Sequence, residues 1–169
     1  MIPVVILLCL IIITLLILFL MGRMYRNKKE IHKFKPSQYN IPFKEVRFLA
    51  KNNCSLYGWW IPSGGNLAES NQTILLVHGW NRNLGRMMPY IRQLSGKGFN
   101  LFAFDARNHG SSDTDGLSSM PKFAEDIKSA MDYLFANLIK NESRIGIIGL
   151  SMGGSAAIYA ASTDKRINR

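Results

Sequence analysis

The sequence predicts an α/β protein with a mostly parallel sheet flanked by helices, preceded by one membrane-spanning helix. Three features support this prediction: an uncharged apolar run at residues 2–21, an alternation of strand-like and helix-like segments from residue 73 onward, and two strand-like segments before it. A strand–helix rhythm is typical of a parallel sheet, because parallel neighbours need a crossover connection. With 169 residues, 47% of them hydrophobic and 19% charged, the chain can bury one core and is too apolar for disorder.

The apolar run at the N-terminus is interpreted as a transmembrane anchor spanning residues 1–22. Twenty residues without a charge make a helix about 30 Å long, which matches the hydrocarbon core of a bilayer. A cleaved signal peptide is a less favoured alternative, since no Lys or Arg precedes the run and no small-x-small cleavage site follows it. A buried helix of a soluble protein is the third and weakest alternative.

Half of the net charge of +10 falls in a short segment directly after the anchor. This segment, residues 23–35, contains one acidic residue, Glu30, and six basic ones: Arg23, Arg26, Lys28, Lys29, Lys33 and Lys35. The positive-inside rule therefore places the following domain in the cytoplasm, as part of a single-pass membrane protein. The basic cluster either only fixes this topology, which we favour, or also lies on anionic lipid headgroups. A nucleic-acid partner is not expected, because the basic residues form no aromatic-interleaved stripe through the domain.

Residues 23–42 are predicted to form a basic juxtamembrane linker, with Pro36 and Pro42 near its end. Segments rich in good strand formers then predict two strands, at 43–50 and 54–62. The composition of residues 63–72 predicts a loop.

The remaining segments predict three strands that alternate with three helices. Short, wholly apolar runs predict strands covered on both faces, at 73–77, 100–104 and 144–148. Apolar residues at helical spacing, or runs of small residues, predict helices at 84–94, 121–138 and 152–161. The last residues of the chain predict a turn leading into a further strand.

A Gly-x-Ser-x-Gly motif lies at residues 149–153, where the third apolar strand turns into the last helix. This is the context that a nucleophile elbow requires. Gly149 and Gly153 would relieve crowding in a strained turn, so that the Ser151 hydroxyl projects above the strand ends, beside a helix N-terminus that favours negative charge. The alternative is a glycine-rich turn with an idle serine, and the context favours the nucleophile.

Two further loops follow apolar strands. In the loop after residues 73–77, Gly79 permits a tight turn, and a backbone N–H from this loop together with that of Met152 would form an oxyanion hole. His78 is interpreted as a structural residue rather than a base. Asp105 and Arg107 begin the loop after residues 100–104 and are interpreted as parts of a hydrogen-bonded scaffold turn.

The segments HGW, FDARNHGSS and GLSMGG, in this order after three successive strands, resemble the α/β-hydrolase superfamily, particularly its microbial esterase- and peptidase-like members. The resemblance covers about residues 44–169. It implies that Ser151 is the nucleophile, that Trp80 and Met152 supply the oxyanion-hole N–H groups, and that residues 105–112 form a structural turn. With only Cys9 and Cys54 and no His/Cys cluster, we expect no disulfide framework, no metal and no cofactor.

The resemblance also implies a catalytic acid and histidine after the nucleophile. The 18 residues after Ser151 contain Asp164 and no histidine, while His32, His78 and His109 all precede it. We therefore expect residues 43–169 to be the N-terminal part of a hydrolase domain, with its late strands missing and inactive alone, because a serine without a base is a poor nucleophile.

Two functions remain open from the sequence. The first is a membrane-anchored serine hydrolase that cleaves an ester, thioester or amide through an acyl-Ser151 intermediate, with a small-molecule, acyl or peptide substrate and membrane lipid around its anchor. The second is a non-catalytic membrane protein with at most an interaction role. A nucleotide-binding domain is disfavoured, because both glycine-rich phosphate-binding motifs are absent.

Overall fold

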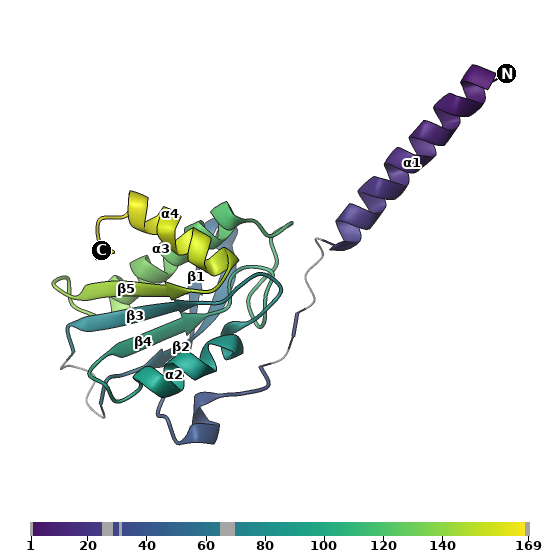
Figure 1. Cartoon of the computed structure of the whole chain (residues 1–169). Helices are drawn as coiled ribbons and strands as arrows, with labels where there is room; N and C mark the ends of the chain where they lie inside the picture. The colour runs from purple at the N-terminus through teal and green to yellow at the C-terminus, as the bar shows by residue number, and fades with distance from the viewer. Residues whose placement is uncertain (1, 25–28, 31, 65–69, 168–169) are drawn as a thin grey trace.

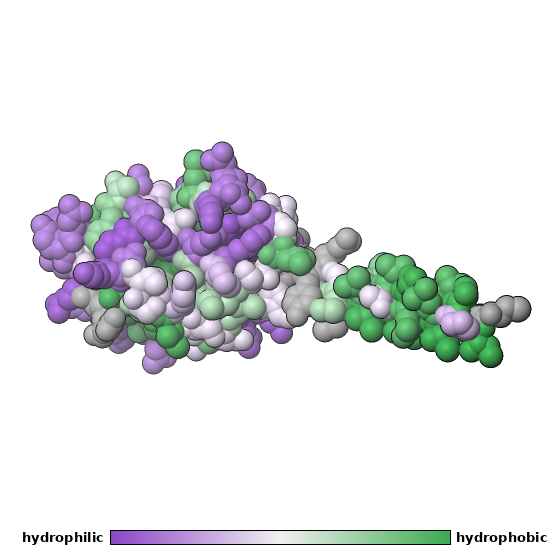
Figure 2. Space-filling model, turned by 90° about the horizontal axis from the view of Figure 1, so that it is seen from above, coloured by the Kyte–Doolittle hydropathy of each residue, from purple (hydrophilic) through white to green (hydrophobic). Residues whose placement is uncertain are grey.

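The computed structural model describes residues 2–24, 29–30, 32–64 and 70–167, which form one long apolar helix and one α/β domain (Figure 1). The helix, α1 (Ile2–Met24), includes a candidate membrane span of 22 residues, Ile2–Arg23, within which the most apolar 18-residue window has a mean hydropathy of 3.6 and is not buried against the rest of the chain. Its apolar surface contrasts with the mixed polar surface of the domain (Figure 2). The predicted apolar helix is therefore confirmed, and its length and composition suit a membrane anchor or a signal sequence.

The domain is built on a mixed sheet in the order β1-β2-β4-β3-β5. Its strands are β1 (Lys44–Leu49), β2 (Ser55–Ile61), β3 (Gln72–Val77), β4 (Asn100–Phe104) and β5 (Arg144–Gly149). The pairs β1–β2 and β2–β4 are antiparallel, whereas β4, β3 and β5 run parallel to one another. The predicted pair of leading strands and the three apolar strands are all confirmed, each within two residues of the expected bounds.

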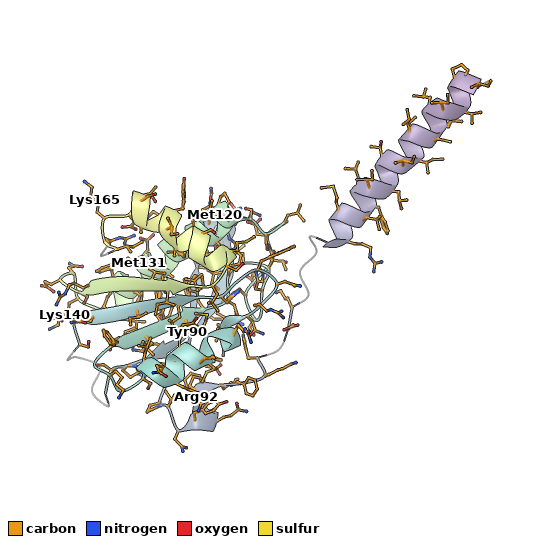
Figure 3. The ribbon with its side chains drawn as sticks, viewed as in Figure 1. Tyr90, Arg92, Met120, Met131, Lys140 and Lys165 are labelled. Carbon is orange, nitrogen blue, oxygen red and sulfur yellow. The ribbon has the colours of Figure 1, made fainter. Side chains whose placement is uncertain are left out.

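Helices cover both faces of the sheet (Figure 1). The 3₁₀ helix η3 (Leu84–Met87) and the helix α2 (Met88–Leu94) pack on one face, and α3 (Met120–Asn137) and α4 (Met152–Thr163) on the other. Tyr90 of α2 and Met131 of α3 accordingly lie on opposite sides of the sheet (Figure 3). Trp59 and Trp60 are fully buried in these two separate cores, because successive residues of a strand point to opposite faces.

The single helix expected at residues 84–94 is divided in the structure into η3 and α2. Pro89 has no N–H with which to continue a regular hydrogen-bond ladder, and the N–H of Met88 bonds instead to the carbonyl of Gly85. Two more 3₁₀ turns, η1 (Pro36–Tyr39) and η2 (Lys51–Asn53), lie in the juxtamembrane segment and between β1 and β2. Of the expected loop at 63–72, residues 65–69 lie outside the described residues, as do Arg26 and Lys28 of the basic cluster.

The described residues of the juxtamembrane segment lie against the domain. Lys29 Nζ donates to the carbonyl of Ser112, and the Asn83 side chain donates to the carbonyl of Glu30 over 2.9 Å. His32 lies 5.3 Å from Tyr57, measured between ring centroids, in a stacked arrangement. The sequence predicted a linker over residues 23–42 by composition, and these contacts show that Lys29, Glu30 and His32 pack against the folded domain.

At the other end of the described chain, Ile167 forms a parallel bridge with Ile145 of β5 and is buried. Arg166 and Asp164 make the turn before it, since the Arg166 N–H and guanidinium both donate to the Asp164 carboxylate. This geometry matches the predicted turn leading toward a further strand beside β5. Residues 168 and 169 lie outside the described residues.

Candidate active site

The three loops that the sequence singled out meet at one edge of the sheet. Val77 of β3 is paired in register with Phe104 of β4 on one side and with Gly149 of β5 on the other. The three parallel strands therefore end together, and the loops that begin at His78, Asp105 and Leu150 emerge side by side. In open α/β sheets this carboxyl edge is the usual place for ligands.

Ser151 lies in a strained turn between β5 and α4. Its φ of 50° and ψ of −119° are unusual for a residue with a side chain, and such strain is concentrated at functional sites. The residue is exposed, and its hydroxyl makes no capping bond to α4. The Ser151 hydroxyl is therefore presented to solvent rather than used within the fold.

Gly149 and Gly153 allow this turn through close backbone packing. A Cβ atom on Gly149 would lie 2.4 Å from the carbonyl oxygen of Gly153, and one on Gly153 would lie 2.4 Å from that of His78. Neither position has space for a methyl group. The two glycines of the motif thus bring the start of α4 against the end of β3, as the elbow interpretation requires.

The loop with Gly79 and Trp80 is packed against the elbow. A Cβ atom on Gly79 would lie 3.1 Å from the carbonyl oxygen of Leu150 and 3.3 Å from Ser151 Cβ, so the two loops touch. Met152 is the first residue of α4, and an N–H at that position has no partner within its helix. The arrangement suits an oxyanion hole made by the N–H groups of Trp80 and Met152, which stays a prediction.

His78 and His109 are both buried beneath these loops, with their ring centroids 5.0 Å apart. His78 Nδ1 lies 2.7 Å from the carbonyl of Gly79, and its Nε2 accepts the N–H of Ala106. His109 repeats the pattern, with Nδ1 2.8 Å from the carbonyl of Arg107 and Nε2 accepting the N–H of Asn81. Because a carbonyl only accepts and an N–H only donates, both rings are neutral with the proton on Nδ1. Neither Nε2 lone pair remains to take a proton from Ser151.

We expect these two histidines to make the fold sensitive to acid. Burial lowers the pKa of His78. Burial, followed by the repulsion that a protonated His78 would exert, lowers the pKa of His109 from 6.5 to about 4. A folded-state pKa below the unfolded value contributes stability above pH 6.5 that is lost as the pH falls toward 4. For His109 the full loss is about 3 kcal/mol. Urea unfolding of the whole chain in neutral detergent, followed between pH 7.5 and 4.5, measures this loss.

The matched variant for this test is His109→Gln, which keeps a hydrogen-bonding side chain and removes the titration. Its unfolding midpoint is expected to fall less steeply with acid than that of the original chain. Equal slopes for the two proteins would contradict the assignment of the acid sensitivity to His109.

Asp105 joins three segments of the chain. Its carboxylate is fully buried and accepts the N–H groups of Leu84 and Ser111 over 2.7 and 2.8 Å. His32 Nε2 lies 2.7 Å from the same carboxylate, with only 5% of its side chain exposed. Gly110 is packed directly on the carboxylate, where a Cβ atom would overlap the Asp105 oxygens. The sequence singled out Asp105 but not His32, because nothing in the local pattern links a juxtamembrane histidine to this turn.

Arg107 is the centre of a buried ion cluster below the same loop. Its Nε donates to Asp126 over 2.6 Å, and its two terminal nitrogens reach Asp115 and Glu125 over 2.9 and 2.6 Å. Burial opposes the charge of the guanidinium, but the hydrogen bond to Glu125 and the charge of Asp126 outweigh this effect and raise the pKa of Arg107. Arg107 thus ties the loop to α3, with its own side chain buried and its partners Asp115 and Glu125 partly exposed.

Within the described residues, no group of three or more His, Cys, Asp or Glu side chains is arranged to hold a metal ion. The candidate site consists of the Ser151 hydroxyl, the loops packed against it and, as a prediction, the adjoining backbone N–H groups. In this arrangement the serine oxygen is suited to add to a carbonyl carbon, and the backbone N–H groups are suited to stabilise the oxyanion that results.

The comparisons with known proteins agree with this geometry. Residues 68–168 match the family model described as serine aminopeptidase, S33. The chain is 33% identical over 118 residues to the uncharacterized protein YfhR of Salmonella typhimurium, covering 69% of this chain and 40% of that protein. It is also 30% identical over 129 residues to the thiohydrolase aneE of Aspergillus aculeatus, covering 74% of this chain and 39% of that protein.

Among solved structures, the Pyrococcus furiosus esterase Pf2001 is similar, with a TM-score of 0.72 and 31% identity over 84% of this chain and 52% of the esterase. The chain thus spans about half of that esterase and about 40% of the curated relatives named above. The segment that the family model matches contains β3, β4 and β5, the turn at Ser151 and the loops that begin at His78 and Asp105. On the strength of that match, this chain belongs to the serine aminopeptidase S33 family of α/β hydrolases.

Proposed function

We propose that this chain supplies the nucleophile of a membrane-anchored serine hydrolase that acts on an ester, thioester or amide. The observation that carries the proposal is the strained backbone of Ser151, held by the close packing of Gly149 and Gly153. In this mechanism Ser151 Oγ attacks the substrate carbonyl carbon and loses its proton to a base. The N–H groups of Trp80 and Met152 stabilise the oxyanion, and the leaving group departs to give an acyl-Ser151 ester that water hydrolyses.

The base for this reaction is proposed to come from outside the described residues. The Nε2 atoms of His32, His78 and His109 each have a partner at the sites described above. In the superfamily the acid and the histidine follow the nucleophile along the chain. The similar proteins extend well beyond the segment that matches, so a longer polypeptide of this kind has room for both.

The proposal that α1 is an anchor rests on its length, its exposed apolar surface and the cationic residues that follow it. The positive-inside rule then places the hydrolase domain in the cytoplasm. A C-terminal reporter that is active only outside the cytoplasm is expected to stay silent. A strong reporter signal, or cleavage of the chain after residue 22, would contradict this placement.

Chemical rescue tests the proposed nucleophile directly. A triad without its base loses most of its rate enhancement, while the serine and the oxyanion hole remain. We therefore expect the whole chain in neutral detergent to react slowly with a fluorophosphonate probe, and at least ~10-fold faster when free imidazole is added as the base. The exposed position of Ser151 gives imidazole access to its hydroxyl.

Two variants serve as controls for this measurement. Ser151→Ala is expected to abolish the imidazole-dependent labelling, whereas Ser155→Ala, an exposed serine in the first turn of α4, is expected to leave it intact. Rapid labelling of Ser151 without imidazole would show that a base is present within these residues. A chain that does not label even with imidazole would favour the non-catalytic alternative.

A further inference from the structure

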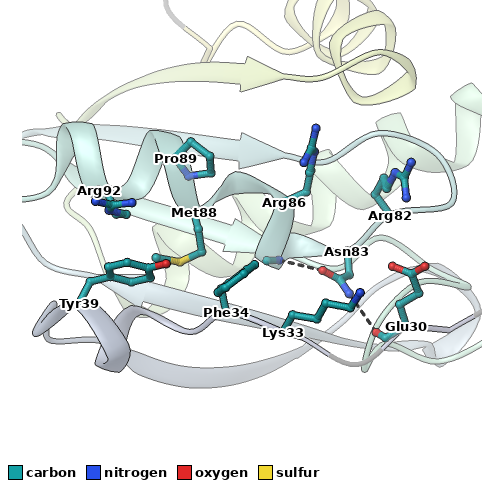
Figure 4. A pocket seen from close by; sticks show the side chains of 11 residues that line it. Glu30, Lys33, Phe34, Tyr39, Arg82, Asn83, Arg86, Met88, Pro89 and Arg92 are labelled. Atoms are coloured by element: carbon teal, nitrogen blue, oxygen red, sulfur yellow. Dashed lines mark hydrogen bonds between the residues drawn. The ribbon is translucent and has the colours of Figure 1, made fainter.

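A cavity of about 370 Å³ lies between the juxtamembrane segment and the helices η3 and α2, and Ser151 is not among the residues that line it (Figure 4). One wall comes from residues 30–39 and the other from residues 82–92. Six of its lining side chains carry the argument: Lys33, Phe34, Tyr39, Arg82, Arg86 and Arg92.

The cavity is strongly cationic. Four of its lining residues are basic, and Glu30 is the single carboxylate among them. Within the described residues, no carboxylate lies within ion-pair distance of Lys33, Arg82 or Arg86. Guanidinium groups that are exposed and lack a carboxylate partner suit a phosphate, which accepts paired hydrogen bonds from each of them.

The two walls are held together by the chain itself. The Asn83 side chain accepts the N–H of Gly85 on one wall and donates to the carbonyl of Glu30 on the other, over 3.1 and 2.9 Å. Farther along, the Arg92 guanidinium lies over the Tyr39 ring, with Cζ 4.5 Å from the ring centroid. Internal contacts therefore hold the two walls of the cavity together, and one of its cations, Arg92, is positioned by the Tyr39 ring.

The covalent connection to α1 keeps this cavity close to a bilayer. Five residues lie between Met24, the end of α1, and Glu30 at the cavity wall, and the six Cα–Cα steps of a fully extended chain span about 20 Å. Phe34 lines the cavity with 52% of its surface exposed. An exposed aromatic ring beside cations suits the boundary between headgroups and acyl chains, whereas free phosphate would leave the ring without a partner.

We propose that this cavity binds the phosphate of an anionic phospholipid in the bilayer that holds α1. The inference rests on the proposed anchoring of α1 and assigns Arg82 and Arg86 as the principal phosphate contacts. Arg82 lies two residues after Trp80 in the same loop. A bound headgroup therefore also fixes the loop that is proposed to supply an oxyanion-hole N–H.

The test is lipid binding to the whole chain in neutral detergent, followed by native mass spectrometry with dioctanoyl phosphatidylglycerol as the probe. The Arg82→Gln/Arg86→Gln variant is expected to bind this lipid about 10- to 30-fold more weakly, since each cation near a lipid surface contributes about 1 kcal/mol. The control Lys140→Gln/Arg144→Gln removes the same charge near the amino end of β5, where Lys140 is labelled in Figure 3, and is expected to bind as the original chain does.

Three results would overturn the proposal: equal binding of dioctanoyl phosphatidylcholine, displacement of the lipid by an equal concentration of inorganic phosphate, or an equal loss in both double variants. We expect Ser151→Ala to bind the lipid as the original chain does, which would show that lipid binding does not depend on the proposed nucleophile. Alkaline carbonate extraction of membranes tests the anchor independently. A protein that is extracted by carbonate and yet binds the lipid in detergent would refute the anchoring and not the pocket.

Discussion

Replacing Gly153 by alanine is expected to unfold the domain or to lower its stability by several kcal/mol. The added Cβ would lie 2.4 Å from the carbonyl oxygen of His78, 2.7 Å from that of Val77 and 3.0 Å from Val77 Cγ1. These are atoms at the end of the central strand β3, so the methyl group cannot be accommodated by rotating a side chain. Overpacking of this kind costs about 1–3 kcal/mol or more, against a net stability of about 5–15 kcal/mol for a whole domain.

Gly146→Ala is the matched control. Gly146 lies in β5, three residues before the elbow, and a Cβ atom there would meet nothing within 4 Å. We expect this variant to unfold at the same urea concentration as the original chain, or at a slightly higher one. Tryptophan fluorescence is the appropriate probe, because the three tryptophans are at positions 59, 60 and 80, all in the domain. Equal midpoints for the Gly153 and Gly146 variants would contradict the packing argument.

Arg107→Met is expected to cost about 3–5 kcal/mol, because it leaves a buried carboxylate without its partner. Arg107 and Asp126 are each about 99% buried at the side chain, and the guanidinium also reaches Glu125 and the carbonyl of Lys122. The backbone N–H of Arg107 donates to the second oxygen of Asp126 over 2.8 Å, so the loop and α3 are joined through this carboxylate. The loss is measured by urea unfolding with the same fluorescence probe.

Two further variants distinguish the effect of breaking the buried ion pair on stability from the effect of removing any one positive charge. Lys128→Met removes an exposed partner of Asp132 on the same helix and is expected to change stability by less than about 0.5 kcal/mol. Arg107→Met combined with Asp126→Leu removes both buried charges and is expected to recover much of the loss. If the double variant were no more stable than Arg107→Met, the isolated Asp126 charge would not be the cause.

The five strands, the two helices after residue 120 and the sharp turn at Ser151 agree with the predictions because the sequence patterns that specify them are local. Apolar runs such as residues 73–77 predict strands buried on both faces, and in the structure the three strands of this kind, β4, β3 and β5, are neighbours in the sheet. The positions of Gly149 and Gly153 around Ser151 also follow from a local requirement, namely a turn with no room for a Cβ atom. The division of the expected helix at Pro89 was not predicted, although it depends on a local feature, the missing N–H of proline.

Contacts between distant segments were decided by the tertiary structure alone. His32 and Asp105 are 73 residues apart, and Asn83 and Glu30 are 53 apart, so no sequence period relates them. They meet because the strand order places the loops after β3 and β4 next to each other, beside the returning juxtamembrane segment. The sequence by itself determined the apolar helix, the positions of the strands and the turn at Ser151. Only the fold decided that the cations of residues 33, 82, 86 and 92 share one cavity, because side chains this far apart converge only after the sheet has formed.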